Sequence, residues 1–423
     1  MKLLLSLLFA LASWIVFADK VAFRKVPYAG KYSNKKTVIP KYVSRGKNEF
    51  RGLWVATVEN IDFPRTQSAS AFKAAYSRLL ANAKKAGFNA VIFQVRPSSD
   101  AFYRSDINPW SRNLTGIEGT GISGFDPLAY MVKATHLEGM QFHAWLNPYR
   151  VCGNTKVAPA QYLTTLSKMN FARQNPHFVL APPSERAGYR TLLLDPGIPQ
   201  VRSHILATVS EIVSKYDVDA IHFDDYFYPY GGVDNLDLMT YKKYNPLKLS
   251  LHDWRRNNVD LVIKSVKSML DAHAKKSGRK VQFGVSPFGI WGNASKIAGG
   301  SLTGGKESYF INYADTRKWV QRRWVDYIVP QLYWHFGHET AAYACLVDWW
   351  CATVKGTGVR LYIGLAPYRL SSAEWSSREL ADQLRYNSNK SEVSGNVMFS
   401  YSKVFFPSKK ALPGVRQALY LWK

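Results

Sequence analysis

Short apolar runs alternate with segments of helical periodicity along most of the chain, beginning at residue 51. Continuous apolar runs are typical of parallel strands covered on both faces, and apolar residues three or four positions apart indicate amphipathic helices. The expected strands are residues 51–57, 90–96, 141–146, the beginning of 219–230, 281–286, 327–332, 361–365 and 395–400. The expected helices are residues 68–85, 126–138, 199–216, 254–274, 315–324, 341–353 and 373–387, with a last helix beyond Pro413.

Eight strand-then-helix units in succession predict an α/β fold, a (β/α)8 TIM barrel spanning residues 49–423. A long insertion follows the third strand: residues 148–197 are rich in proline and break the rhythm. Insertions in such loops usually shape a substrate site. The alternative is a doubly wound sheet, which would carry a glycine-rich phosphate loop after its first strand. Residues Glu59–Pro64 contain no glycine at that point, so the barrel is favoured.

The N-terminus has the pattern of an export signal. Lys2 precedes an apolar run over residues 3–17, and a small-residue cleavage site ends at Ala18. We therefore expect residues 1–18 to be a signal peptide, with export to the periplasm, the cell envelope or the exterior and no transmembrane segment after cleavage. An uncleaved anchor is the alternative. Residues 19–48 show little periodicity and are interpreted as an N-terminal extension, mobile or lying on the surface.

The composition limits the classes of partner that the protein could bind. Apolar residues make up 47 % of the chain, enough for a full core, and the formal net charge is +26. The basic residues are scattered, and no zinc-finger or RNA-recognition motif accompanies them, so a nucleic-acid partner is not supported. An acidic polymer or an anionic cell envelope fits the charge. Cys345 and Cys351 could pair after export or remain buried thiols, and with Cys152 they lack the histidine spacing of a zinc site.

Two adjacent carboxylates, Asp224 and Asp225, end the fourth expected strand and are followed at once by aromatic residues. An unpaired buried charge costs several kcal/mol, so such a pair is uncommon without a function. Neighbouring like charges also push their pKa values apart, which makes an acid and its partner from one residue type. A polar strand end is the plainer interpretation, but the surrounding aromatics favour a catalytic pair.

In a barrel the functional groups gather where the strands end. The strand ends here share aromatic rings, amides, acids and arginines, which suit a sugar: rings stack on its C–H faces and planar polar groups bind its hydroxyls. The candidate substrate-binding residues are Glu59, Gln94, Arg96, Asp100, His143, Trp145, Asn147, Tyr149, Arg150, Tyr226, Ser286, Phe288, Trp291, Gln331, Trp334, Tyr368 and Tyr401, with Tyr333 as a third catalytic candidate. His143 and Gln94 could instead be core residues, Arg96 and Arg150 structural ion-pair partners, and Trp54 a packing residue.

Several phrases of the sequence resemble one family in order along the chain. They are RGLWVAT from Arg51, FQVRP from Phe93, AWLNPYR from Ala144, LDPG from Leu194, HFDDYFYP from His222, VSPFG from Val285 and PQLYW from Pro330. The chain is similar over about residues 49–405 to the glycoside-hydrolase-like 10 family of exported bacterial proteins. The resemblance implies a (β/α)8 barrel that hydrolyses cell-wall glycan, including peptide-free strands. It also implies Asp224 and Asp225 as the acidic pair, with Asn147, Gln331 and Tyr333 lining the site, whereas the position of Glu59 is not acidic in many relatives.

Asp224 and Asp225 are adjacent in the sequence, and this limits the catalytic mechanisms that they could support. Ordinary glycosidases hold two carboxylates on opposite sides of the bond, about 5 Å apart if retaining and about 6.5–9.5 Å if inverting. Neighbouring residues seldom do so, and the late strand ends carry no acid. A substrate-assisted mechanism fits: the sugar's 2-acetamido oxygen attacks, Asp224 orients the acetamido N–H, Asp225 acts as general acid and then base, and Tyr333 donates to the acetamido oxygen. A conventional pair of Asp224 with Glu59 or Asp100 is the alternative.

The expected function is therefore hydrolysis of N-acetylated cell-wall polysaccharide, without a cofactor or metal. Two other functions stay open. A barrel can bind glycan without catalysis, since a fold by itself does not establish a reaction. A metal-dependent polysaccharide deacetylase could use His222, Asp224 and Asp225 as ligands. A basic envelope protein that holds nucleic acid is a more distant alternative.

Overall fold

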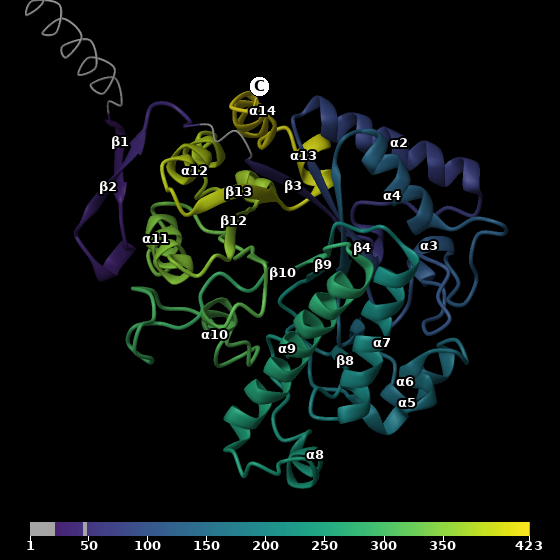
Figure 1. Ribbon diagram of the computed structural model, residues 1–423. Helices are drawn as coiled ribbons and strands as arrows, with labels where there is room; N and C mark the ends of the chain where they lie inside the picture. The colour runs from purple at the N-terminus through teal and green to yellow at the C-terminus, as the bar shows by residue number, and fades with distance from the viewer. Residues whose placement is uncertain (1–21, 45–48, 423) are drawn as a thin grey trace, which may run out of the picture.

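The computed structural model describes residues 22–44 and 49–422 and shows strands and helices alternating from Phe50 onward (Figure 1). Eight parallel strands pair in chain order, and the last pairs with the first to close a barrel. The barrel strands are β3 (Phe50–Val55), β4 (Ala90–Arg96), β5 (Gln141–Leu146), β9 (Ala220–Phe223), β10 (Gln282–Val285), β11 (Tyr327–Ile328), β12 (Arg360–Leu365) and β13 (Val393–Met398). The predicted (β/α)8 architecture is confirmed.

Amphipathic helices cover the outside of the barrel, with their apolar faces in one continuous core against the strands. Most of these helices are α2 (Ala69–Lys85), α4 (Pro127–Leu137), α7 (Pro199–Lys215), α9 (Leu251–Ser277), α11 (Tyr343–Val354), α12 (Glu379–Ser388) and α14 (Leu412–Tyr420), with the short α10 (Thr316–Gln321) between β10 and β11. The shorter ones are α3 (Arg112–Thr115), α8 (Leu238–Lys243) and α13 (Tyr401–Phe405). Ser68 caps α2 by accepting from the Ala71 N–H, and Asp126 caps α4 by accepting from the Leu128 and Ala129 N–H groups.

Several elements are shorter than predicted, and two of them are shortened near prolines. The strand expected at 327–332 keeps only two ladder residues, because Pro330 has no N–H to donate. Beyond it, Gln331 forms isolated bridges with Phe288 and Gly364. The helix expected at 373–387 begins only at Glu379, after a 3-10 turn, η4 (Pro367–Ser371), that opens on a proline.

Polar groups occupy the interior of the barrel beneath the strand ends. The Tyr327 hydroxyl lies 2.8 Å from His143 Nδ1 and 3.1 Å from His222 Nδ1. A Cβ atom at Gly284 would lie 1.9 Å from the Tyr327 ring, so only glycine leaves room for that tyrosine. Burial lowers the pKa of His143 to about 4 and that of His222 well below its usual value, so both rings stay neutral.

The insertion after β5 folds into its own small sheet, which the sequence did not predict. Strand β6 (Arg150–Thr155) pairs antiparallel with β8 (Arg190–Leu194), which pairs in turn with β7 (Val179–Leu180). Between them lie α5 (Pro159–Thr165), α6 (Phe171–Gln174) and η3 (Pro176–Phe178). The sheet rises directly from the end of β5, so it stands at the edge of the barrel mouth.

The segment interpreted as an extension contains a β-hairpin, which the sequence did not predict. Strand β1 (Ala22–Pro27), η1 (Gly30–Tyr32) and β2 (Lys36–Pro40) lie beside α11 and α12 (Figure 1). Val26 and Ile39 are buried in the main core, and Arg24 lies 3.0 Å from the buried carboxylate of Asp382. The expected signal peptide, residues 1–18, lies outside the described residues.

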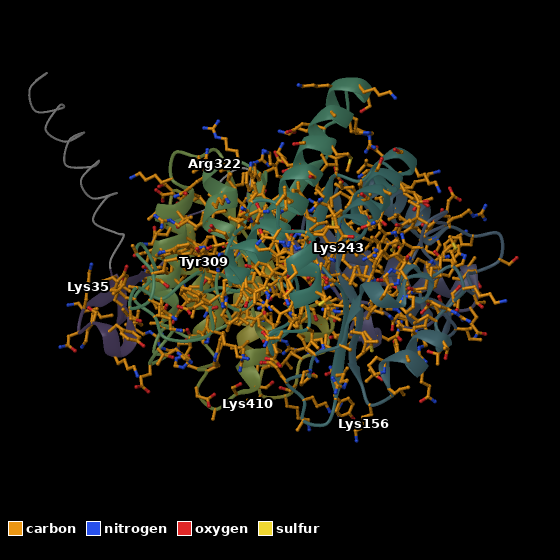
Figure 2. All side chains as sticks on the ribbon, turned by 90° about the horizontal axis from the view of Figure 1, so that it is seen from below. Lys35, Lys156, Lys243, Tyr309, Arg322 and Lys410 are labelled. Carbon is orange, nitrogen blue, oxygen red and sulfur yellow. The ribbon has the colours of Figure 1, made fainter. Side chains whose placement is uncertain are left out.

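Three further observations concern the sequence predictions. Cys152, Cys345 and Cys351 are all free thiols, so the pairing of Cys345 with Cys351 is not formed. None of the helices within residues 22–44 and 49–422 is both long and apolar enough to span a membrane. Figure 2 shows basic side chains such as Lys35, Lys156 and Arg322 at widely separated points of the molecule.

Candidate active site

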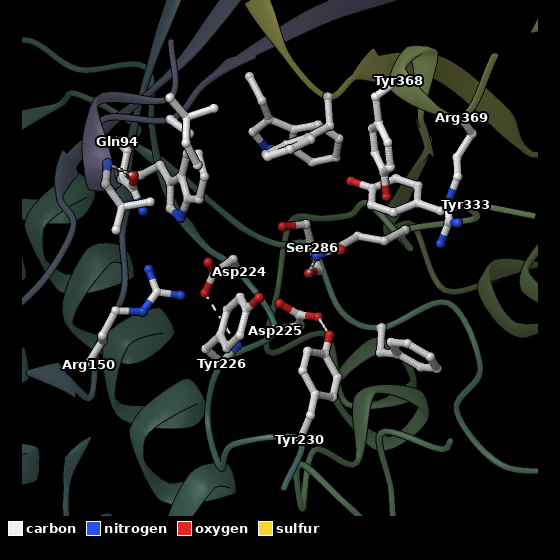
Figure 3. Close-up of a pocket in the computed structure, with 18 of the residues that line it drawn as sticks. Gln94, Arg150, Asp224, Asp225, Tyr226, Tyr230, Ser286, Tyr333, Tyr368 and Arg369 are labelled. Carbon is white, nitrogen blue, oxygen red and sulfur yellow. Dashed lines mark hydrogen bonds between the residues drawn. The ribbon is translucent and has the colours of Figure 1, made fainter. Parts of the chain in front are cut away.

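A cavity of about 420 Å³ opens at the carboxyl ends of the barrel strands (Figure 3). Loops that follow several strands line it, as expected for a TIM barrel. Its lining residues are Trp54, Ala56, Val58, Ile61, Gln94, Trp145, Arg150, Glu185, Asp224, Asp225, Tyr226, Tyr230, Ser286, Phe288, Lys306, Gln331, Tyr333, Trp334, Tyr368, Arg369 and Phe399. Both adjacent aspartates therefore face one common space.

Asp224 is the first residue beyond β9 and is buried. Its Oδ2 accepts a hydrogen bond of 2.6 Å from Asn147 Nδ2, and its Oδ1 accepts one of 3.3 Å from the Tyr226 N–H. Burial raises the pKa of Asp224, while the Arg150 charge and the bond from Asn147 oppose that rise. These partners stabilise the ionised carboxylate.

Asp225 occupies a different environment, although it is the next residue. Its Oδ2 accepts a hydrogen bond from the Tyr230 hydroxyl, whereas its buried Oδ1 makes no hydrogen bond of normal geometry with the described residues. Burial, and then the charge of Asp224, raise the pKa of Asp225 well above its ordinary value. Burial thus raises the pKa of both acids, but only Asp224 accepts the bond from Asn147 that opposes the rise, so Asp225 is the acid that holds its proton more strongly.

A chain of amides fixes the donor to Asp224. Gln94 Oε1 accepts from the backbone N–H groups of Thr57 and Val58, both at 2.9 Å, which orients the Gln94 amide. Gln94 Nε2 then donates to Asn147 Oδ1 at 2.5 Å. Because the oxygen of Asn147 is used in this way, its Nδ2 is the atom that remains for Asp224. Residues from β4 and the end of β5 therefore position a carboxylate at the end of β9.

Aromatic rings form the walls of the cavity. The Tyr333 ring lies 6.0 Å from Tyr368, and Phe288 packs edge-on against Trp334 at 5.4 Å. Burial raises the pKa of Tyr333 well above its ordinary value, so its hydroxyl stays protonated and able to donate. Tyr226 is 41 % exposed and presents a flat face at the mouth. Such walls stack on the C–H faces of sugar rings.

Charged groups surround the rim. The Arg150 guanidinium lies over the Tyr226 ring at 4.4 Å, and Arg369 lies over Tyr368 at 5.5 Å. Lys306 forms an ion pair with Glu185, which joins the loop after β10 to the loop before β8. The rim therefore holds three cations against one acid besides the buried pair.

Most of the predicted site residues lie in the lining of this cavity. They are Asp224, Asp225, Tyr333, Gln94, Trp145, Arg150, Tyr226, Ser286, Phe288, Gln331, Trp334 and Tyr368. Asn147 contacts Asp224 from behind the wall. Glu59 is exposed and lines a neighbouring hollow instead.

The other predicted residues lie outside the lining, in hydrogen bonds to other parts of the protein or, for Tyr149, in the core. Arg96 donates to the Asn147 and Pro148 carbonyls, and His143 bonds to Tyr327 inside the barrel. Asp100 accepts from the Ser98 N–H and Tyr149 is buried in the core. Trp291 donates to Asp315, and Tyr401 accepts from Asn82.

Several lining residues were not predicted. Trp54, interpreted as packing, faces the cavity and donates to His222 Nε2 at 3.3 Å. Tyr230 belongs to the aromatic stretch after the acids, and Arg369 and Phe399 follow strand ends, so position could have indicated all three. Glu185 and Lys306 lie in long loops, and no local pattern marks them.

The arrangement expected for a metal-dependent deacetylase is not present. His222 Nε2 lies 2.9 Å from Ser286 Oγ, and its Nδ1 faces Tyr327 inside the barrel. Across the described residues, no three His, Cys, Asp or Glu side chains are grouped so as to hold a metal ion.

The closed parallel barrel, the paired carboxylates and the aromatic cavity place this protein in the class of TIM-barrel proteins that are suited to carbohydrate chemistry. Within that class, residues 49–382 match the model of the Glycosyl hydrolase-like 10 family, and the chain belongs to this family. It is 40 % identical over 367 residues to Glycosyl hydrolase YngK of Bacillus subtilis, covering 84 % of this chain and 69 % of that protein. It is also 40 % identical over 385 residues to Glycosyl hydrolase DigH of Escherichia coli K12, covering 85 % and 84 %.

Among solved structures, the catalytic domain of β-amylase from Paenibacillus polymyxa superposes with a TM-score of 0.54. The match covers 89 % of this chain and 99 % of that domain at 11 % sequence identity, so it bears on the fold alone. The family match supports a glycosidase.

Proposed function

We propose that this protein is an exported glycosidase that hydrolyses N-acetylated bacterial cell-wall glycan, in strands that carry no peptides. The observation that carries the proposal is the pair Asp224 and Asp225, consecutive in the chain, buried in one cavity and held by different partners. A glycoside hydrolase needs one carboxyl group that keeps its proton and one that stays ionised. The contrast between the two sites supplies both.

The surroundings of each acid indicate its role in catalysis. Asp225, with its raised pKa and free Oδ1, is suited to protonate the leaving glycosidic oxygen. Asp224, stabilised as an anion by Asn147 and Arg150, is suited to accept a hydrogen bond from the substrate and to stabilise positive charge.

The nucleophile is the remaining question, because neighbouring residues seldom lie on opposite faces of a sugar. Asp100 is buried outside the cavity, and Glu59 lines the adjacent hollow. Glu185 is the one further acid in the cavity lining, and it is held in an ion pair with Lys306. We therefore infer that the substrate's own 2-acetamido oxygen attacks the anomeric carbon.

In this mechanism the acetamido oxygen forms a bond to C1 while the C1–O bond to the leaving sugar breaks. Asp225 gives its proton to the leaving oxygen, and Asp224 accepts a hydrogen bond from the acetamido N–H. The Tyr333 hydroxyl donates to the acetamido oxygen. Asp225, now ionised, then takes a proton from water, whose oxygen opens the ring intermediate and restores the acetamide with retained configuration.

Substrate class and location rest on charge and on the N-terminal pattern. Bare cell-wall strands carry lactyl carboxylates, and a chain of net charge +26 attracts them over distances of about 10 Å at 0.1 M salt. Exposed Arg369 adds a cation at the cavity rim. Residues 1–18 have the pattern of an export signal, which would deliver the enzyme to that substrate.

The test is digestion of purified peptide-free cell-wall strands, with product masses read by mass spectrometry. We expect sugar fragments whose summed mass exceeds that of the uncut strand by one water for each bond cleaved, with their acetyl groups retained, and no products from Asp225→Asn. Asp106→Asn, which changes an exposed acid, is the matched control and should digest normally. Loss of acetyl groups without chain cleavage would show a deacetylase, and the absence of any product would refute the proposed activity.

A further inference from the structure

A second hollow adjoins the catalytic cavity. It has a volume of about 250 Å³, and Arg150, Glu185, Tyr226 and Tyr230 line both spaces. These shared residues form a partition, with Arg150 stacked on the Tyr226 ring at 4.4 Å. The partition also carries the donor to Asp225, because Tyr230 binds that carboxylate. The second hollow is therefore a direct neighbour of the reacting groups.

The insertion sheet builds the far wall of this hollow. Asn154 comes from β6 and Thr191 from β8, which lie side by side in the antiparallel pair. The Ser184 hydroxyl donates to Asn154 Oδ1 at 2.5 Å, which holds the Asn154 amide in one orientation and leaves its Nδ2 as a donor. Thr191 Oγ1 donates to the Gly153 carbonyl at 2.9 Å and keeps its lone pairs as acceptors.

Glu59 closes the hollow from the side of β3. It is exposed, and no ion pair to it is formed within the described residues. Its backbone lies in the left-handed region, with φ 52°, which is unusual for a residue other than glycine. A hollow lined by an amide, several hydroxyls, two carboxylates, an arginine and two tyrosine rings matches the hydroxyl groups and the C–H face of a sugar.

We propose that this hollow is a further sugar subsite, which binds a neighbouring unit of the same glycan chain while its bond is cleaved at Asp224 and Asp225. This inference rests on the proposed function. It gives the insertion after β5 a role: the insertion extends the binding site beyond the catalytic cavity. It also gives Glu59 a role in binding, with no part in bond cleavage.

Gly153 offers a way to fill the subsite. A Cβ atom added there meets no atom within 4 Å, so a large side chain can enter the hollow without displacing the protein. Gly153→Trp should therefore block the subsite and leave the catalytic cavity open. Ala272→Trp, on the exposed part of α9, adds the same side chain away from the barrel mouth and is the matched control.

The experiment measures kcat/KM for peptide-free cell-wall strands separated by length into disaccharide-to-tetrasaccharide and longer fractions. We expect the wild type and Ala272→Trp to prefer the longer strands. In Gly153→Trp that preference should fall about tenfold, which corresponds to about 1.4 kcal/mol. If circular dichroism shows that Gly153→Trp is unfolded, Thr191→Val supplies the same comparison.

The outcomes separate the two proposals. Wild-type turnover without a length preference, or a preference that Gly153→Trp and Thr191→Val leave unchanged, would overturn the subsite and leave the glycosidase intact. A wild-type protein that cleaves neither fraction would refute the proposed function, and the subsite with it.

Discussion

Replacing Asn147 with leucine removes the side-chain donor that stabilises the ionised form of Asp224. The bond is 2.6 Å long, buried and charge-assisted, and such bonds contribute about 1.5–3 kcal/mol. One pKa unit corresponds to about 1.4 kcal/mol, so the loss should raise the pKa of Asp224 by the equivalent of that free energy. Because Asp224 must be ionised for turnover, the acidic limb of the kcat/KM profile should move to higher pH by that amount.

The assay is the pH dependence of kcat/KM on peptide-free strands, fitted with apparent pKa values that belong to the coupled pair. The alkaline limb, which reports the loss of the Asp225 proton, should move much less. Asn147→Leu should also lower the free energy of unfolding by about 1–3 kcal/mol, because Gln94 Nε2 loses its acceptor.

Asn387→Leu is the matched control. Asn387 is likewise buried and likewise bonded on both sides of its amide, to Tyr343 and Asn396, but it lies on α12 away from the cavity. It should lose a similar amount of stability and keep the wild-type pH profile. An acidic limb that does not move in Asn147→Leu, or that moves equally in Asn387→Leu, would refute the role given to Asn147 and Asp224.

Two further predictions concern stability. Burial raises the pKa of Asp100 to about 7, so its contribution to the free energy of unfolding is present below about pH 4 and is lost as the pH rises toward 7. In urea titrations the free energy of unfolding of Asp100→Asn should therefore match that of the wild type at pH 4 and exceed it at pH 8. Equal curves at both pH values would contradict this. Ile39→Ala should lower the free energy of unfolding by about 2–4 kcal/mol, because Ile39 is 0 % exposed. Val38→Ala, at a residue that is 38 % exposed, should lower it by under about 0.5 kcal/mol. Equal losses would show that the hairpin is not part of the core.

The barrel could be predicted because a strand covered on both faces must be apolar on both faces. All seven residues of β4 are buried, and the sequence there is nearly all apolar. The hairpin β1–β2 gave no such signal, because its strands are short and mix apolar residues with basic residues, threonine and proline in no regular alternation. Tertiary contacts order the hairpin: Val26 and Ile39 pack into the main core, and Arg24 pairs with Asp382.

Site residues that directly follow a strand could be predicted from the sequence. Site residues that are positioned by the paths of long loops could not. The carboxyl ends of parallel strands converge, so Asp224, Gln331 and Tyr368 meet in one cavity. Asp100 and Trp291 also follow strands, but their loops turn away and bury them elsewhere. Glu185 and Lys306 are 121 positions apart and meet only because two long loops cross the mouth.

The most direct test of the proposed mechanism is inhibition by a thiazoline sugar, which mimics the ring that forms when the acetamido oxygen attacks C1. If the substrate supplies its own nucleophile beside Asp224 and Asp225, the thiazoline should inhibit hydrolysis of peptide-free strands competitively and bind far more tightly than substrate. An active enzyme that a saturating thiazoline leaves unaffected would contradict the mechanism and assign the attack to a protein carboxylate.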